Sequence, residues 1–172
     1  MPQKIRKRLT FIIVILLSLS AAVVILNFCF SQTYALVLEE LPAGETLWAA
    51  PLKEGESFQL RYIHSVDLTP VYETFQNNKG VLVLVESRFK TWGAGLGYMG
   101  EGVLSEEEGW TVIRQMERCL ESLPLRVGTV AEHTIIYRKK EIVLKELILP
   151  QSLLNIRLRK KYLSWRETDE FF

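Results

Sequence analysis

The feature that most restricts the fold of this chain is a series of short segments rich in β-branched and aromatic residues, separated by turn-forming residues. Such segments are typical of β-strands, and their spacing favours antiparallel pairing in a sandwich or partly open barrel. The segments expected to be strands are 35–40, 57–65, 70–76, 81–90, 134–138, 142–149 and 153–158. We therefore predict an all-β, mostly antiparallel domain.

The segment 110–123 admits two interpretations. Apolar residues with helical spacing begin at Trp110, after an acidic run at 106–108 that would suit the start of a helix. From Val112 to Arg118, however, apolar and charged residues alternate as they do in a strand. Both interpretations stay open, and a short helix near 106–122 is the one helix that the sequence permits in this domain.

The N-terminus has the pattern of a membrane anchor. Four basic residues within the first eight positions precede an uncharged, apolar run from Leu9 to Phe30. As a helix this run would be about 33 Å long, which is enough to cross a hydrocarbon core of about 30 Å. A cleaved signal peptide usually has a shorter apolar region, so cleavage near Ala35 is the alternative. We predict a basic tip and transmembrane anchor at 1–34 and one β-domain at 35–172.

The charge distribution gives the expected orientation and excludes one class of partner. The basic tip should stay in the cytoplasm, which places the β-domain outside. That domain contains all 20 acidic residues and 17 of the 21 basic ones. An excess of acidic residues gives no reason to expect nucleic-acid binding. The two cysteines of the chain, one of them in the apolar run, form no disulfide framework.

Ionisable side chains are concentrated in three neighbouring predicted strands. If 66–69 and 77–80 are four-residue hairpin loops, strand pairing aligns them on one sheet face, since directly paired residues share a face. The residues expected together at one end of that face are Tyr62, His64, Glu73, Glu86 and Arg88. A slip of one residue would divide this set between the two faces.

These side chains have two interpretations, because buried carboxylates and guanidinium groups need partners. In the first, Arg88 and His64 bind a polar or anionic ligand or a partner. In the second, these side chains pair and hydrogen-bond with one another, with Arg88 bridging Glu73 and Glu86. In that case Ser65 and Thr69 would bond the backbone of the intervening turn.

A glycine-rich segment follows these strands. Gly93 and Gly95 should form a flexible or tightly turned loop beside the ionisable cluster, as a lid would. Gly95 to Gly100 also matches G-x-G-x-x-G, but dinucleotide binding requires a helix at once and a parallel βαβ unit. We therefore predict no cofactor.

Enzymatic alternatives rest on His64. A hydrolase would pair His64 with a carboxylate, whereas Ser65 next to it in a strand would point to the opposite face. A zinc site would need His64 with Glu73 and Glu86, yet the chain has only two histidines and no tight ligand spacing. We predict no metal site and favour a protein without enzymatic activity.

Two blocks of residues resemble a known family. The first runs from Tyr62-x-His64-Ser65 to Thr69-Pro70 and Glu73, and the second joins Glu86-x-Arg88 to Gly93-Ala-Gly95-Leu96. Together they resemble a bacterial family of domains of unknown function. Its small proteins often begin with a signal or anchor, and their genes often lie beside tripartite (TRAP) transporters of the TAXI subclass. This chain has Gly97 where the family usually has proline. The resemblance implies solute uptake at the membrane and no particular mechanism.

From these observations we expect a single-pass protein of the bacterial cytoplasmic membrane whose C-terminal domain lies outside. The expected function is that of an accessory to a TAXI-type TRAP transporter. The expected partners are the membrane subunits or the solute-binding protein of that transporter, by resemblance. An extracytoplasmic hydrolase using His64, or a purely structural β-module, are the alternatives. The sequence identifies neither the solute nor the oligomeric state.

Overall fold

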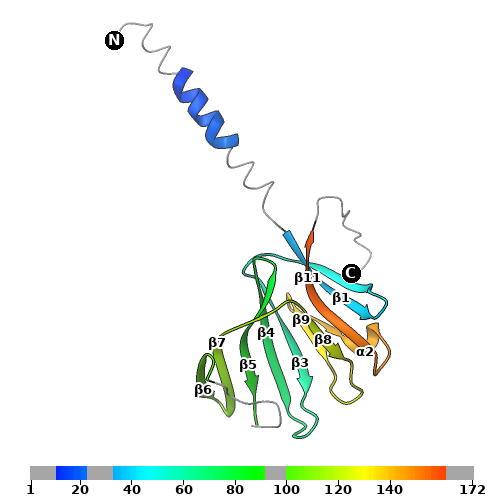
Figure 1. Cartoon of the computed structure of the whole chain (residues 1–172). Coiled ribbons are helices and arrows are strands. Elements are labelled where there is room, and N and C mark those ends of the chain that lie inside the picture. Colours follow the sequence, from blue (N-terminus) through cyan, green and yellow to red (C-terminus); the bar gives the residue numbers. More distant parts are fainter. Residues whose placement is uncertain (1–10, 23–32, 92–99, 162–172) are drawn as a thin grey trace. The chain divides into compact units, whose positions relative to one another are not determined.

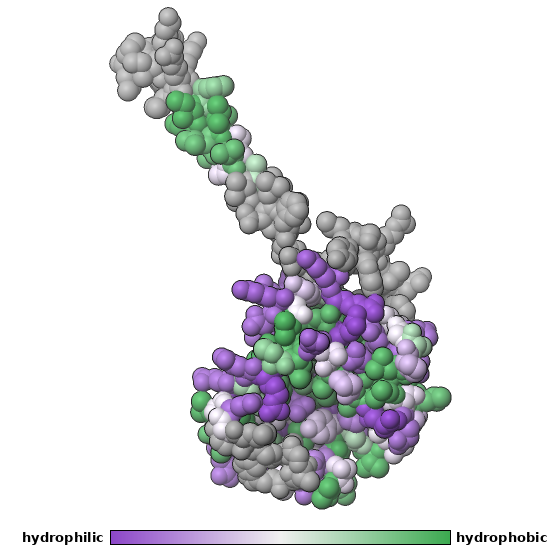
Figure 2. All heavy atoms as spheres, in the orientation of Figure 1, coloured by the Kyte–Doolittle hydropathy of each residue, from purple (hydrophilic) through white to green (hydrophobic). Residues whose placement is uncertain are grey.

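The computed structural model describes residues 11–22, 33–91 and 100–161. The chain divides into two units, residues 1–32 and Thr33–Phe172. In the first unit residues 11–22 are helical, and Figure 2 shows them as almost uniformly hydrophobic. Among the described residues, no helix has both the length and the apolar content that a bilayer crossing needs. The predicted anchor at 9–30 lies partly outside the described residues.

The second unit, here called the β-domain, consists of two antiparallel sheets (Figure 1). In sheet order, the four-stranded sheet contains β2 (Glu45–Leu52), β1 (Thr33–Leu41), β11 (Leu153–Lys161) and β8 (Leu123–Arg126). The seven-stranded sheet contains β10 (Lys140–Val143), β9 (Thr134–Tyr137), β3 (Ser57–Ile63), β4 (Pro70–Asn78), β5 (Val81–Phe89), β7 (Trp110–Leu120) and β6 (Val103–Glu107). The prediction of a mostly antiparallel β-domain is confirmed.

One hydrophobic core joins the two sheets. Leu36 and Ile156 from the four-stranded sheet and Phe58, Phe75 and Ile135 from the seven-stranded sheet belong to it, and each is at most 2% exposed. The rings of Phe58 and Phe75 stack with their centroids 5.4 Å apart. Burying a side chain of this size stabilises a fold by about 1.5–3 kcal/mol, so the inward face of each sheet is the main source of stability.

The structure decides one open interpretation and corrects one predicted strand. The possible helix near 106–122 does not form, and the strand interpretation of 110–123 is the correct one, because β6 and β7 are a hairpin joined by Glu108 and Gly109. Both turn residues have positive φ, which is the requirement of a two-residue hairpin turn and explains the glycine. The strand expected at 142–149 ends at Val143, and α2 (Leu144–Leu147) follows it as a single helical turn.

The first hairpin loop is longer than predicted, and the second is shorter. Ile63 pairs with Pro70, and Asn78 pairs with Val81 across a turn of two residues, Lys79 and Gly80. The predicted pairing from four-residue loops is therefore wrong by two positions in each hairpin. A shift of two positions keeps every side chain on its predicted face, since the strand period is two.

A β-bulge at Val85 changes the face of the residues that follow. Phe75 pairs with Leu84, but Thr74 pairs with Glu86, so β5 has one residue more than β4 at this point. After the bulge Ser87 and Phe89 are buried. Glu86 and the next residue but one, Arg88, consequently point away from the core.

Candidate functional site

Four of the five predicted site residues are divided between the two faces of the seven-stranded sheet, and the fifth, His64, lies in the turn after β3. Tyr62 and Glu73 belong to the inward face, because their strand partners Val71 and Leu60 are core residues. Glu86 and Arg88 belong to the outward face, beyond the bulge. The prediction that one face carries all five is therefore wrong, and any site must be built from one face at a time.

On the inward face, Glu73 is a half-buried carboxyl. Its pair partners are Leu60 on β3 and Ser87 on β5, which are 2% and 6% exposed. Burial raises the pKa of Glu73, and the positive charge of Arg118 opposes this only in part. Burial likewise raises the pKa of Tyr62, and the nearby Glu73 adds to the effect. This face thus favours neutral side chains.

Replacing Glu73 with glutamine should stabilise the β-domain at pH 7–8. Because the folded-state pKa is raised, the protonated carboxyl stabilises the fold fully below the unfolded pKa, and this contribution disappears as pH rises through the folded pKa. The gain of Glu73→Gln should therefore be largest at neutral pH and shrink toward pH 4. Urea unfolding between pH 4 and pH 8 measures it, with the exposed Glu121→Gln as control. A loss of stability at pH 7 would refute the expected sign.

His64 lies in the tight turn after β3. Its backbone N–H donates to the carbonyl of Thr69, and its carbonyl accepts from the N–H of Leu68. The residue is 8% exposed, and its Nδ1 lies 3.0 Å from the Asp67 carboxylate. Ser65 is exposed in the same turn. The hydrolase alternative needs His64 at the floor of an open cleft, and this burial does not favour it.

The second histidine of the chain lies beside Tyr62, at the same end of the sheet as His64. His133 is 8% exposed, and its ring lies 5.8 Å from the ring of Tyr62. Burial lowers the pKa of His133, so the neutral imidazole is favoured. In the segments that the structure describes, no group of three or more His, Cys, Asp or Glu residues could hold a metal ion.

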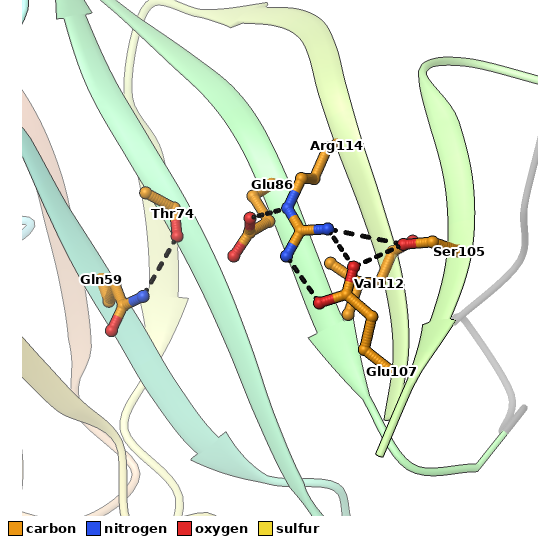
Figure 3. Close-up of polar contacts among 7 residues, drawn as sticks. All are labelled: Gln59, Thr74, Glu86, Ser105, Glu107, Val112 and Arg114. Carbon is orange, nitrogen blue, oxygen red and sulfur yellow. Dashed lines mark hydrogen bonds and ion pairs between the residues drawn. The ribbon is translucent and has the colours of Figure 1, made fainter. Parts of the chain in front are cut away.

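On the outward face, Arg114 is the centre of a charged network (Figure 3). Its Nε donates to Glu86 on β5 at 3.0 Å, and its Nη2 donates to Glu107 on β6 at 2.8 Å. The Ser105 hydroxyl also donates to Glu107, at 3.0 Å. Hydrogen bonds from Arg114 and Ser105 lower the pKa of Glu107 to about 2. Glu107 is therefore ionised at every physiological pH, and the network links three adjacent strands.

Beside this network lies an aromatic and cationic group, which we call the Trp110 cluster: Tyr72, Arg88, Lys90 and Trp110. The Arg88 guanidinium lies 4.6 Å from the centre of the Trp110 ring, and the Lys90 ammonium lies 5.0 Å from it. The Tyr72 ring meets Trp110 edge to face at 5.7 Å. These distances are those of cation–π and aromatic pairs.

Arg88 has a different environment from the one expected. It does not bridge Glu73 and Glu86, because Glu73 is on the other face and Glu86 is bound to Arg114. Its Nε is buried without a hydrogen-bond partner among the described residues. Its guanidinium instead packs against the ring of Trp110.

The remaining predicted site residues are Thr69, in the turn before β4, and the two glycines Gly93 and Gly95. The Thr69 hydroxyl lies 3.1 Å from that of Thr91, which is two residues beyond the end of β5. Gly93 and Gly95 lie outside the described residues, so the predicted lid stays a prediction. Sequence reasoning missed Glu107 and Arg114 as interacting residues. The Glu108-Gly109 turn was the signal for the hairpin that brings them together.

Comparison with known families returns one match. A family described as "Domain of unknown function (DUF1850)" matches residues 58–144, which is half of the chain and extends from the second residue of β3 through β10. No curated protein and no solved structure matches the chain.

Proposed function

The chain belongs to the DUF1850 family, a domain of unknown function, and we propose that it is a non-enzymatic accessory protein of a TAXI-type TRAP solute transporter. In this proposal the apolar N-terminal segment anchors it in the cytoplasmic membrane with the β-domain outside. The outward face of β4, β5, β7 and β6 contacts a membrane subunit or the solute-binding protein of the transporter. Confinement to the membrane raises the effective concentration of the β-domain near such a partner.

The Trp110 cluster is the observation that supports a docking role. Trp, Tyr and Arg are the residues most enriched at the energetic centres of protein interfaces. Here they stand together on an outward sheet face, away from the core. The salt-bridge network of Arg114 with Glu86 and Glu107 lies next to them, as a polar rim lies around the centre of an interface.

The transporter as partner rests on the resemblance of the two sequence blocks. The first block is the turn around His64 with Glu73, and the second contains Glu86 and Arg88. Arg88 belongs to both the resemblance and the Trp110 cluster. One residue of the family pattern thus also belongs to the surface that the proposal assigns to docking.

Co-purification of the full chain from native membranes in mild detergent tests this function. We expect a TRAP membrane subunit or its solute-binding protein to be enriched over a bait with an unrelated anchor. Reproducible absence of every transporter subunit would count against the proposal.

A purely structural role is the second candidate, because the Arg114 guanidinium already donates hydrogen bonds to Glu86 and Glu107 within the sheet. A charged network of this kind can fix strand register without binding anything. The two candidates differ in the effect of changing Lys90, which is exposed at the end of β5 and belongs to no ion pair among the described residues. Only the docking role requires Lys90 for the capture of a partner.

A further inference from the structure

The outward face of the four-stranded sheet carries a buried carboxylate between two arginines. Leu36 and Leu38 of β1 belong to the core, so Glu39 points away from it. Glu39 is nevertheless only 3% exposed. Both arginines come from β11, which runs antiparallel beside β1 (Figure 1). The Arg159 Nη2 lies 2.5 Å from one Glu39 oxygen, and the Arg157 Nε lies 3.5 Å from the other.

Arg159 has to cross the sheet face to reach Glu39. Its pair partner on β1 is Ala35, and Glu39 lies four positions further along the strand. Because outward positions recur every second residue, the arginine stem passes over Val37, which is fully buried. The side chains of Arg157 and Arg159 remain 40% and 35% exposed. Their stems thus cover the sheet, while their guanidinium ends stay accessible from outside.

Polar atoms on this face lack hydrogen-bond partners. The Nε atoms of Arg157 and Arg159, one oxygen of Glu39 and the Oδ1 of the neighbouring Asn155 are buried without such a partner among the described residues. Buried polar atoms in native proteins rarely stay unpaired, so four of them together indicate that an occupant is missing. Two guanidinium groups share one carboxylate here. The occupant should therefore bring a further carboxylate, which the planar fork of an arginine binds well.

The chain itself supplies carboxylates next to this face. β11 ends at Lys161, and residues 162–172, here called the acidic segment, lie outside the described residues. The acidic segment contains three carboxylates and one basic residue: Glu167, Asp169, Glu170 and Arg166. Glu167 follows Lys161 by six residues, which can span about 20 Å. Arg157 lies four residues back along β11, which is about 14 Å in a strand. The acidic segment is therefore long enough to turn back over both arginines.

We propose that the acidic segment docks on the outward face of β1 and β11, where its carboxylates bind Arg157 and Arg159. A tether this short holds the carboxylates at an effective concentration of about 1 mM or more. The headgroups of anionic lipids are a less favoured occupant, because the three acidic residues beside the arginines would be repelled from an anionic surface. While it is docked, the acidic segment neutralises this face and covers it. The proposal does not depend on the transporter partner.

Hydrogen exchange of the full chain in zwitterionic lipid nanodiscs, followed by mass spectrometry, tests the docking. The amides of 167–170 should exchange about tenfold more slowly than the same sequence does in an unstructured peptide. Arg159→Gln should remove most of this protection, and so should about 0.5 M NaCl, which screens exposed charges. Arg138→Gln is the matched control, because Arg138 is also paired with a glutamate, Glu56, but belongs to a turn of the other sheet. It should leave the exchange within about twofold of the native rate.

A second variant leaves the sheet untouched. Glu167→Gln, Asp169→Asn and Glu170→Gln together remove the three carboxylates, so the acidic segment should exchange at the intrinsic rate of its new sequence. The exchange of β11 should stay native, which shows that the β-domain is still folded.

Four results would overturn the proposal. Exchange of the native acidic segment at its intrinsic rate excludes docking. Protection that survives Arg159→Gln, in protein with native exchange of β11, places the docking elsewhere. Protection that survives the removal of the three carboxylates excludes their role. An unprotected acidic segment, together with retention of phosphatidylglycerol that is lost in Arg159→Gln, would assign this face to lipid headgroups.

Discussion

Replacing Asn77 with alanine should lower the free energy of unfolding by about 2–4 kcal/mol. Asn77 is fully buried, and its side chain connects the two sheets. The amide nitrogen donates to the carbonyl of Leu52 on β2 at 2.8 Å, and the amide oxygen accepts from the N–H of Gly80 at 2.8 Å. Alanine would leave both backbone groups without these partners, and an unsatisfied buried group costs about 1–3 kcal/mol.

The neighbouring Asn78 offers a matched control. It is the same residue type one position along β4, but it is exposed. Asn78→Ala should change stability by about 0.5 kcal/mol or less. Urea unfolding of the two variants at one pH gives the comparison. If Asn77→Ala cost no more than Asn78→Ala, the bond between the two sheets would contribute nothing to stability.

The strands that were predictable are those in which β-branched and aromatic residues alternate with polar ones. In β4, Val71 and Phe75 face the core while Tyr72 and Thr74 face outward. In such segments the alternation indicates both that a strand forms and which of its faces is buried. The strands that were not predicted lack this composition. β2 contains Ala49, Ala50 and Pro51, and β8 contains Pro124, and these residues have low strand propensity.

The sheet face of each site residue could be predicted only for strand positions before the Val85 bulge. The residues of β5 before it, 81–84, have no glycine or polar residue that would mark an extra position. A bulge depends on twist and on packing between strands, which local sequence does not reveal. Its consequence is large, because one extra residue moves Glu86 and Arg88 to the other face. The grouping of the ionisable residues on one face was therefore wrong.

The second large effect concerns the Trp110 cluster. If this cluster is the docking surface, Trp110→Ala should raise the Kd for the captured transporter subunit by about thirtyfold, the equivalent of about 2 kcal/mol at an interface centre. The indole is the common contact of Tyr72, Arg88 and Lys90, so its removal disperses the whole cluster. Because Trp110 is half-buried, the thermal unfolding of the variant has to be compared with that of the native protein first.

The most direct measurement is the amount of transporter subunit that full-length bait variants retain from native membranes. Lys90→Glu reverses an exposed charge 5.0 Å from the Trp110 ring, and Lys145→Glu makes the same change on α2. With both variants as stable as the native protein, Lys90→Glu should reduce retention by about tenfold, and Lys145→Glu should retain the native amount. Native retention by both Lys90→Glu and folded Trp110→Ala would contradict the assignment of this face as the docking surface.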